Sequence, residues 1–355
     1  MKLFTIGPVQ MYQRTLDVQA KMVPYFRTKE FSDVMFRVDK SFKKIIGTAS
    51  DSQVIYMTNS GTGAMEAAID NLFDSKDKVI VINGGTFGAR FLSLCQRHNI
   101  EASEIKVAFD EELSNEVLIP FENKGYTALL VNIDETSIGK LYDIKLLSKF
   151  CKDNNLLFVV DAISSAFIDP FYMDDFGVDV TIVSSQKGLC LAPGISMVVL
   201  NKKALNKLED KKSSCAYFDF KDYIKDMERG QTPYTPAVGL LFELLSEVEY
   251  IEKTGVENRV KEVEDRAKYF RSRLSEIGFK TPSFHLSNAV TPCVLPKPYA
   301  KELFEYLKNE HEFFINPCGG AHASDMIRVA HVGDLSHADY DQLIEYIKEF
   351  QKQYE

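Results

Sequence analysis

Short apolar runs alternate with stretches of helical periodicity over roughly the first two thirds of the chain, and this alternation strongly constrains the fold. The apolar runs read as strands buried on both faces of a sheet, and they lie at residues 54–57, 78–82, 128–131, 156–160, 180–183 and 196–200. Between them, apolar residues recur at helical spacing at residues 62–73, 86–98 and 144–154. We therefore predict an α/β fold with a mostly parallel sheet and helices on both of its faces.

The alternation of strand and helix patterns ends at Pro236. A long helical pattern runs from about residue 238 to 277. Two further amphipathic helices and two strand patterns follow, at residues 299–309, 337–353, 289–291 and 326–329. We therefore expect a large α/β domain at 16–236 and a smaller C-terminal α+β domain at 237–355, which residues 1–15 could join.

The composition favours a globular protein without nucleic-acid or membrane partners. The 355 residues are 45% hydrophobic and 26% charged, and the net charge of −9 argues against binding to an anionic nucleic acid. Apolar runs such as 128–131 are too short to span a bilayer. The six cysteines show neither a CxxC motif nor metal-ligand spacing, so we expect a reduced, cytoplasmic location and no metal.

An aspartate and a lysine follow two neighbouring predicted strands. Asp161 ends the run at 156–160, and Lys187 follows the run at 180–183. Their separation, 187 − 161 = 26 residues, is about one strand–connection–strand unit. Pyridoxal 5'-phosphate needs such a pair, because the amine forms a Schiff base and the carboxylate keeps the pyridine nitrogen protonated. The sequence therefore predicts a pyridoxal-phosphate enzyme, although a solvated loop lysine is the common alternative for Lys187.

The segment Ser60-Gly61-Thr62 lies between a predicted strand and a predicted helix. A helix N-terminus presents free N–H groups and partial positive charge, which suit a phosphate. Ser60 and Thr62 can add hydroxyl donors, and Gly61 lets the backbone approach closely. A simple N-cap is the alternative. A dinucleotide fingerprint is incomplete, because Glu66 stands where its third glycine is needed. We predict phosphate binding here.

Two more turns follow predicted strands. Phe87 lies in a glycine-flanked turn, where its ring could stack on a pyridine or pack at a helix start. In the second turn, Thr136 or Ser137 could hydrogen-bond the phenolic oxygen or the phosphate of the cofactor. Glu135 beside them could instead cap a helix or hold the loop in place.

A lone arginine, Arg328, stands among apolar residues in the strand pattern at 326–329. Such an arginine usually pairs with a carboxylate, of the protein or of a substrate, through two parallel hydrogen bonds. We predict that Arg328 binds a substrate carboxylate. The rigid, hydroxyl-bearing segment at 231–236 could be a linker only.

With these residues in place, the chain resembles class V aminotransferases of the type I pyridoxal-phosphate fold. It is most similar to the alanine/serine–glyoxylate and 2-aminoethylphosphonate–pyruvate branch. The resemblance covers nearly the whole chain, from Gly7-Pro8 to the segment at 328–333. Its most specific segments are those at 60–62, 135–139, 160–165 and 185–187.

The resemblance implies a role for each matched residue. Lys187 would be the lysine that holds the cofactor, and Asp161 the partner of its pyridinium. Thr136 would lie near the ring oxygen, and Arg328 would hold the substrate carboxylate. Thr235 would reach the phosphate of the neighbouring subunit, which implies a homodimer. The phosphate ligands and the stacking aromatic would be Ser60, Gly61, Thr62, Gln186 and Phe87.

Several departures from the family pattern leave the substrate open. The segment at 27–31 and Thr62 resemble the aminoethylphosphonate branch, whereas Gln186 resembles the glyoxylate branch. Ile138 stands where a threonine is usual, and Asn132-Ile133-Asp134 replaces a histidine-containing approach to the turn. Because relatives with one fold act on different substrates, the resemblance does not select the donor.

The implied activity moves an amino group to pyruvate or glyoxylate through Lys187, from a small donor of the alanine, serine or 2-aminoethylphosphonate type. A cysteine desulfurase-like enzyme or another lyase of the superfamily is the alternative, with Cys318 as its persulfide cysteine. Against it, Gln186 stands where desulfurases usually have histidine. A binding module that has lost turnover is the third reading, and the presence of Lys187, Asp161 and Arg328 argues against it.

Overall fold

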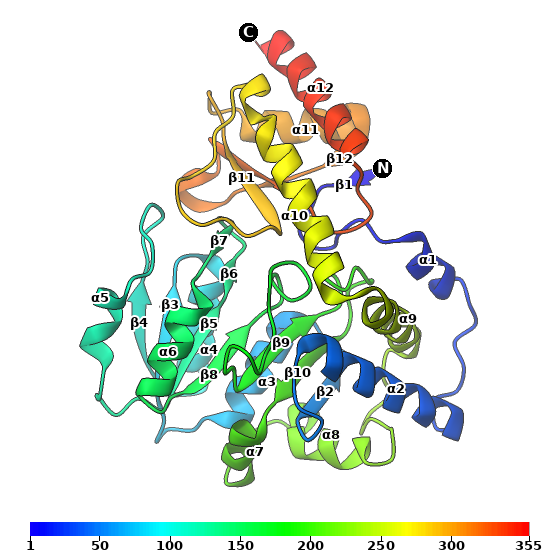
Figure 1. Ribbon diagram of the computed structural model, residues 1–355, viewed down its shortest axis with the longest axis vertical. Coiled ribbons are helices and arrows are strands. Elements are labelled where there is room, and N and C mark those ends of the chain that lie inside the picture. The colour runs from blue at the N-terminus through cyan, green and yellow to red at the C-terminus, as the bar shows by residue number, and fades with distance from the viewer. Residues whose placement is uncertain (355) are drawn as a thin grey trace.

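The computed structural model describes residues 1–354 and is built on a seven-stranded sheet (Figure 1). The strands lie in the order β2-β10-β9-β8-β5-β3-β4. Their bounds are Gln53–Met57 (β2), Lys78–Asn83 (β3), Glu101–Lys106 (β4), Ala128–Asn132 (β5), Leu157–Asp161 (β8), Val180–Ser184 (β9) and Ser196–Leu200 (β10). Only β10 runs antiparallel to its neighbours, so the predicted mostly parallel sheet is confirmed.

Helices cover both faces of this sheet, also as predicted. In β3, Ile80 and Ile82 face one core while Val79 and Val81 face the other, because successive side chains of a strand point to opposite sides. Helices of the first face are α2 (Lys29–Ile46), α6 (Ile144–Asp153) and α9 (Val238–Thr254). Helices of the second face are α3 (Gly61–Leu72), α4 (Thr86–Arg97), α7 (Lys202–Glu209) and α8 (Phe220–Met227).

The apolar pattern predicts six of the seven strands and misses β4. This strand lies at the edge of the sheet, and among its residues only Ile105 is buried. An edge strand with one exposed face needs no continuous apolar run, so its sequence, Glu-Ala-Ser-Glu-Ile-Lys, carries little strand signal.

The C-terminal elements gather at one end of the molecule (Figure 1). A three-stranded antiparallel sheet there has the order β11 (Val290–Val294), β14 (Met326–Ala330) and β13 (Asn316–Pro317). Its helices are α10 (Val256–Ser272), α11 (Ala300–His311) and α12 (His337–Tyr354). The predicted helical pattern at 238–277 is not one helix: Gly255, with φ +93°, separates α9 from α10, and a 3-10 turn at Leu274–Ile277 (η3) ends the segment.

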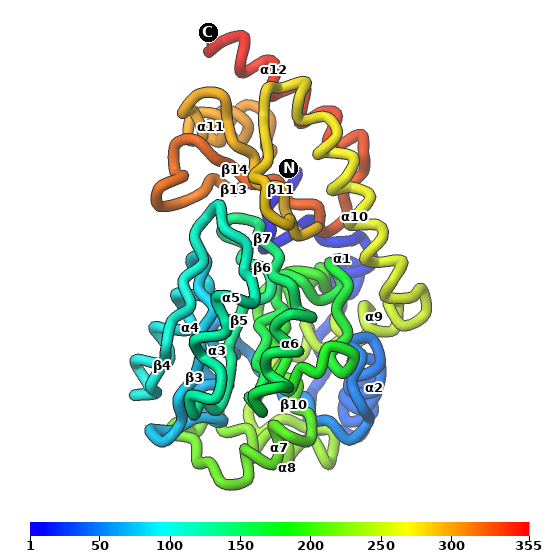
Figure 2. Tube along the Cα trace, turned by 60° about the vertical axis from the view of Figure 1, so that its left-hand side comes forward, coloured from blue at the N-terminus to red at the C-terminus, as the bar shows by residue number. Residues whose placement is uncertain are grey.

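The first residues of the chain pack with these C-terminal elements. Strand β1 (Lys2–Leu3) pairs in parallel with β12 (Phe313–Phe314), and Phe4 lies buried in the same core as Tyr340. Figure 2 places the N-terminus among the C-terminal elements, with α1 (Gln13–Gln19) further along the chain. The domain boundaries at 16–236 and 237–355 stay a prediction.

Short elements complete the structure. They are α5 (Asn115–Leu118), β6 (Asp134–Glu135), β7 (Lys140–Leu141) and the 3-10 turns η1 (Ile119–Phe121), η2 (Ala216–Phe218) and η4 (Gly320–His322). Within residues 1–354, none of the helices combines the length and the apolar character that crossing a membrane requires.

Candidate active site

The carboxyl ends of β5, β8 and β9 lie side by side and open into a cavity of about 190 Å³. Asp161 is the last residue of β8, in register with Asn132 of β5 and Ile182 of β9, and Lys187 lies just beyond the end of β9. Parallel strands deliver their C-terminal loops to one edge of the sheet, where α/β proteins bind ligands. Eight of the predicted site residues line this cavity: Ser60, Gly61, Thr62, Phe87, Thr136, Asp161, Gln186 and Lys187.

Lys187 is buried, with 9% of its surface exposed. Burial lowers the pKa of its amine to about 8, and the charges of Arg328 and Arg90 act in the same direction. The carboxylates of Asp134 and Asp161 oppose this shift. An ordinary lysine is almost fully protonated at neutral pH, so the lowered pKa makes a substantial fraction of the amine available as a nucleophile.

Asp161 is buried at the end of β8, and its Oδ1 accepts a hydrogen bond of 2.9 Å from the backbone N–H of Ile163. Burial raises its pKa to about 6, while that backbone hydrogen bond and the charge of Lys187 pull it down. The group is therefore a carboxylate at neutral pH. That hydrogen bond comes from an uncharged backbone group, and a buried carboxylate of this kind fits a cationic partner such as a protonated pyridine.

The N-terminus of α3 forms a second wall of the cavity. Ser60 is the N-cap of α3, but its hydroxyl makes no capping hydrogen bond, so the first N–H groups of the helix keep their capacity to bind an anion. Gly61 packs closely against Ile163: a Cβ at position 61 would lie 2.4 Å from Cδ1 of Ile163, so that side chain would have to shift. The close contact between the α3 N-terminus and Ile163 therefore depends on glycine.

Two side chains extend this anion-binding wall. The guanidinium of Arg90 donates a hydrogen bond of 2.9 Å to Oγ1 of Thr62, which places a positive charge beside the helix end. Ser184 Oγ donates to Oε1 of Gln186 at 2.6 Å. This contact fixes the orientation of the Gln186 amide, whose NH₂ group can donate to a ligand. The N-terminus of α3, the guanidinium of Arg90 and the amide of Gln186 together suit a phosphate group.

Phe87 is the second residue of α4 and is held there by Glu135. The buried carboxylate of Glu135 accepts hydrogen bonds from the backbone N–H groups of Phe87, at 3.2 Å, and Gly88, at 3.0 Å. Asn132 also donates to it, at 3.2 Å. Glu135 therefore caps α4 and fixes the loop. The guanidinium of Arg90 lies 5.0 Å from the centre of the Phe87 ring.

Arg328 does not line the cavity but contacts the turn that does. Its guanidinium donates to the backbone oxygens of Thr136, at 2.8 Å, and Pro317, at 3.1 Å. Its Nε is buried, with no hydrogen-bond partner among residues 1–354. Thr136 Oγ1 in turn donates to Ser164 Oγ at 2.8 Å. The arginine thus joins β14 to the cavity wall and keeps an unused donor.

Six residues that line the cavity are not among the predicted site residues: Gly7, Met65, Arg90, Asp134, Ile163 and Ser164. Two predicted site residues, Arg328 and Thr235, do not line it. Two signals could have found two of the six: Arg90 follows Phe87 at helical i,i+3 spacing, and Asp134 is an acid two residues after the buried strand β5. Thr235 is exposed and lies outside this cavity, so its predicted contact with a neighbouring subunit remains a prediction.

Comparison with solved structures places this architecture among known folds. The alanine–glyoxylate aminotransferase of Nostoc sp. superposes with a TM-score of 0.92, over 98% of this chain and 94% of that chain, at 24% sequence identity. The chain therefore has the type I fold of pyridoxal-phosphate aminotransferases, as its resemblance to class V aminotransferases implied.

Sequence comparison then identifies the family. The model of the family described as aminotransferase class V matches residues 10–328. An uncharacterized aminotransferase of Methanocaldococcus jannaschii is 31% identical, over 92% of this chain and 86% of that protein. An L-aspartate–glyoxylate aminotransferase of Paracoccus denitrificans is 28% identical, over 88% of this chain and 81% of that protein. This chain belongs to the class V aminotransferases and is an aminotransferase.

Proposed function

We propose that this aminotransferase works with pyridoxal 5'-phosphate bound in the cavity at the ends of β5, β8 and β9. When bound, the cofactor supplies an electron sink for the charge that develops when the substrate loses a proton. The observation that carries the proposal is the joint burial of Lys187 and Asp161 in one cavity, with a nucleophilic amine and an unpaired carboxylate. Asp161 would keep the pyridine nitrogen protonated, and Lys187 would bond the cofactor covalently.

The remaining predicted residues would hold the cofactor in this orientation. Phe87 would stack on the ring, and Thr136 would hydrogen-bond its oxygen. Arg90 adds a positive charge beside the phosphate, because it already donates to Thr62. The ligands that we propose for the phosphate are Ser60, Gly61, Thr62, Gln186 and, from a second subunit, Thr235.

Lys187 would also move the proton during the reaction. Its Nζ would take a proton from the α carbon of the donor and return one to the product, for which a pKa near the working pH is suited. Arg328 would orient the substrate through its carboxylate, using the Nε that has no hydrogen-bond partner among the residues that the structure describes. Burial of the cavity would limit the access of water to the reacting atoms.

We propose a small amino acid or aminophosphonate as the donor, of the alanine, serine or 2-aminoethylphosphonate type, and pyruvate or glyoxylate as the acceptor. The relative from Paracoccus denitrificans is named for glyoxylate, and its donor is L-aspartate, so aspartate belongs among the donors to test.

The alternative activity, desulfurase-like chemistry, has less support than transamination. Cys318 is buried, with 7% of its surface exposed, and burial raises the pKa of its thiol. A cysteine that attacks sulfur must reach the substrate as a thiolate. The Sγ of Cys318 instead faces the backbone oxygen of Ser137, at 3.9 Å.

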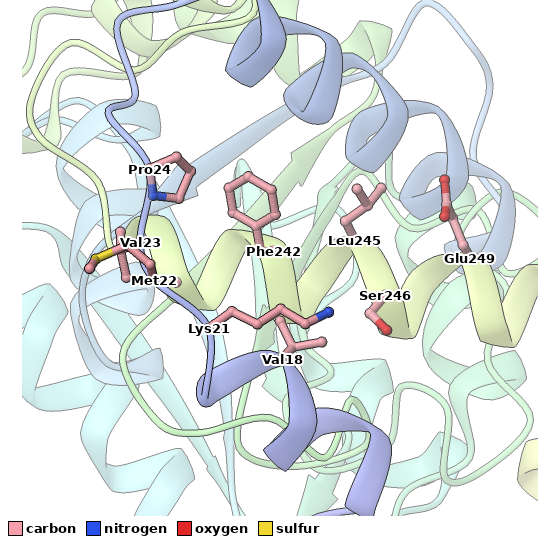
Figure 3. Close-up of a pocket in the computed structure, with 10 residues that line it drawn as sticks. Val18, Lys21, Met22, Val23, Pro24, Phe242, Leu245, Ser246 and Glu249 are labelled. Carbon is pink, nitrogen blue, oxygen red and sulfur yellow. The ribbon is translucent and has the colours of Figure 1, made fainter.

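We also propose that the active enzyme is a homodimer. Met22 is 93% exposed and Tyr25 69%, and both are apolar side chains that a partner would cover. Met22 lines a cavity of about 410 Å³ that opens against α9 and to which Lys187 does not contribute. Figure 3 shows Phe242 and Leu245 of α9 across from Met22 and the residues next to it. The exposure of Thr235 supports a role across such an interface.

We also propose a reducing, cytoplasmic location for this enzyme. All six cysteines are free, and five of them are buried. Buried thiols with no disulfide partner suit a reducing compartment. Fractionation of cells that express the tagged protein would test this, and recovery in an oxidising compartment would contradict it.

The proposed function is tested on the purified enzyme in two steps. Borohydride reduction followed by digestion and mass spectrometry should place the cofactor on Lys187, and Lys187→Ala should carry none. Visible absorbance should then change when one of alanine, serine, aspartate or 2-aminoethylphosphonate is added. A cofactor attached to another residue, or a spectrum that no donor changes, would contradict the proposal.

Sedimentation tests the dimer. Met22→Asp should shift the enzyme towards monomer and lower its activity, because a charge would be buried at the interface. Val117→Asp, at an exposed apolar residue of α5, is the matched control and should change neither property. A monomeric wild-type enzyme would contradict the proposed dimer.

A further inference from the structure

Arg27 is a half-buried cation whose side chain binds a loop of the same chain, residues 230–235. Its guanidinium donates hydrogen bonds to the backbone oxygens of Thr232, at 2.8 Å, and Pro233, at 3.2 Å. It also donates to Oε1 of Gln231, at 3.3 Å. All three acceptors are uncharged, although an arginine usually pairs with a carboxylate or a phosphate. These contacts therefore hold the 230–235 loop in place.

The start of the 230–235 loop is also fixed by its own side chains. Nε2 of Gln231 donates to the backbone oxygen of Phe26, at 3.2 Å, and to Oγ of Ser32, at 2.9 Å. Only 5% of the surface of Gln231 is exposed. Gly230 has φ +67°, and a Cβ there would lie 2.7 Å from the backbone oxygen of Ser32. The loop is thus packed against the start of α2 and the residues before it.

The contacts of Arg27 join the segments that precede two packed helices. Arg27 lies just before α2, and the 230–235 loop lies just before α9. Both helices belong to one core, in which the rings of Phe31 of α2 and Phe242 of α9 lie 6.4 Å apart. Groups supported by packed helices are held more precisely than groups on free loops. Arg27 therefore fixes the position of the loop relative to the sheet.

The far end of the loop lies outside the active site of its own subunit. Thr235 is exposed and does not line the cavity that contains Lys187. Thr232, in contrast, is only 4% exposed, and its hydroxyl donates to the backbone oxygen of Tyr234 at 2.7 Å. A loop that is fixed at its start and exposes a hydroxyl near its end can present that hydroxyl to another molecule. In the proposed function, that molecule is a second copy of this chain.

We propose that Arg27 positions the 230–235 loop so that Thr235 reaches the cofactor phosphate in the cavity of the partner subunit. Because Thr235 and the homodimer belong to the proposed function, the role of Arg27 rests on that function. Each subunit then supports cofactor binding in the other subunit and not in its own. Hydrogen bonds of a hydroxyl span about 2.5–3.0 Å, so a loop displaced by about 1 Å loses the contact. Arg27 acts through Thr235 and is a positioning residue.

The first measurement is the affinity of each full-length apoenzyme for pyridoxal phosphate, followed by absorbance at a concentration where sedimentation shows a dimer. Arg27→Ala should weaken binding by about tenfold, the effect of one lost hydrogen bond to a charged group. Lys44→Ala is the matched control, because Lys44 also joins α2 to α9, through Glu252 at 2.8 Å, but not through the loop. It should bind as the wild type does. Unchanged affinity in Arg27→Ala would overturn the inference.

Mixed dimers show which of the two active sites Arg27 serves. Lys187→Ala and Arg27→Ala subunits are co-expressed with different affinity tags, and the hybrid dimer is purified on both. One of its two sites then combines an intact lysine with an intact loop from the other subunit. The hybrid should therefore regain wild-type affinity at one site per dimer. If Arg27 acts within its own subunit or by general loosening, affinity is not regained, and the inference is wrong.

A second hybrid tests whether Arg27 acts through Thr235. When Arg27→Ala and Thr235→Ala subunits are paired, both sites receive a defective loop, so neither should regain affinity. A chain that carries both substitutions should bind no more weakly than Thr235→Ala alone, because the two changes remove the same contact. Full additivity of the two single effects, or rescue in this hybrid, would overturn the positioning role.

Hydrogen exchange of the apoenzymes gives a readout that does not depend on the cofactor. Peptides that cover the 230–235 loop should exchange faster in Arg27→Ala than in the wild type or in Lys44→Ala, because the loop opens locally more often. Faster exchange over the whole chain would indicate general loosening and would contradict the inference. If Arg27→Ala does not fold, Arg27→Lys replaces it in every measurement, since lysine lacks the forked geometry of the guanidinium.

Failure of the proposed function can be told apart from failure of the inference. A wild-type enzyme that is monomeric, or in which borohydride fixes no cofactor on Lys187, would overturn both. A dimeric wild type with cofactor on Lys187, combined with a first hybrid that regains no affinity, would overturn the role of Arg27 alone.

Discussion

Gly7 lies against the side chain of Lys187: a Cβ on Gly7 would come within 2.7 Å of Cε and 3.2 Å of Nζ. The N-terminal segment, which begins among the C-terminal elements, therefore forms a wall of the cavity at the reactive lysine. Any side chain at position 7 must displace the lysine or the segment itself, because atoms in a packed interior do not approach this closely.

We predict that Gly7→Ala lowers the transamination rate by about a hundredfold, because a displacement of the reacting group by about 1 Å has an effect of this size. The measurement is the rate of the half-reaction with an active donor. Gly319→Ala is the control, because a Cβ there would meet no atom within 4 Å. A Gly7→Ala enzyme with the wild-type rate would show that Lys187 has more freedom than this contact implies.

A second prediction concerns Gly61 and Ile163. Gly61→Ala should weaken cofactor binding by about tenfold, or about 1.4 kcal/mol, because its Cβ would push Cδ1 of Ile163 into the cavity. Ile163→Val removes that methyl group, so the double variant should regain most of the affinity. Titration of the chain with pyridoxal phosphate, followed by absorbance, measures both. Equal affinities of the single and double Gly61 variants would rule out this contact as the cause.

A third prediction concerns Arg328. Arg328→Ala should raise KM for the oxo acid by roughly 10- to 100-fold, because a desolvated charge pair is lost. It should also lower the melting temperature, since the hydrogen bonds to the backbone oxygens of Thr136 and Pro317 disappear. Arg229→Ala, at an exposed arginine paired with Asp226, is the control. Unaltered steady-state kinetics with both pyruvate and glyoxylate would remove Arg328 from substrate binding.

The fourth prediction is a two-step dependence of cofactor capture on pH. Asp161, with a pKa of about 6, is a carboxylate above pH 6 and loses its charge as the pH falls through that value. Lys187, with a pKa of about 8, loses its proton as the pH rises through 8 and becomes nucleophilic. The capture rate should therefore rise with pH in steps near 6 and near 8. Stopped-flow absorbance between pH 5 and 9 measures it, and Asp161→Asn should lack the lower step.

The sequence predicts six of the seven strands, including β2 at one edge of the sheet, and misses β4 at the other edge. Buried parallel strands need apolar residues on both faces, so β8 and β9 are recognisable in the sequence. Asp161 and Lys187 are then found at or just after the ends of these strands. The edge strand β4 has one buried residue and no such signal. The break at Gly255 was also missed, because α9 and α10 carry helical periodicity on both sides of it.

The residues of the site also divide into those that local sequence reveals and those that depend on tertiary contacts. Residues that end a strand or begin a helix, such as Asp161 and Ser60, are found because their local context is visible in the sequence. Gly7 escapes because its importance depends on a contact with a residue 187 − 7 = 180 positions away. Arg328 was found as a lone charge in an apolar strand, but its contact with the turn at Thr136 could not be predicted.

The sequence by itself determined the alternation of strands and helices, the mostly parallel sheet and the pair Asp161 and Lys187, because periodicity and strand ends are local properties of the chain. Tertiary structure decided that Gly7 closes against Lys187 and that Asp134 is buried with no hydrogen-bond partner in the part of the chain that the structure describes. These properties depend on distances between segments that are remote in the sequence. Burial then sets the protonation of Lys187 and Asp134, since the energy of a charge depends on everything packed around it.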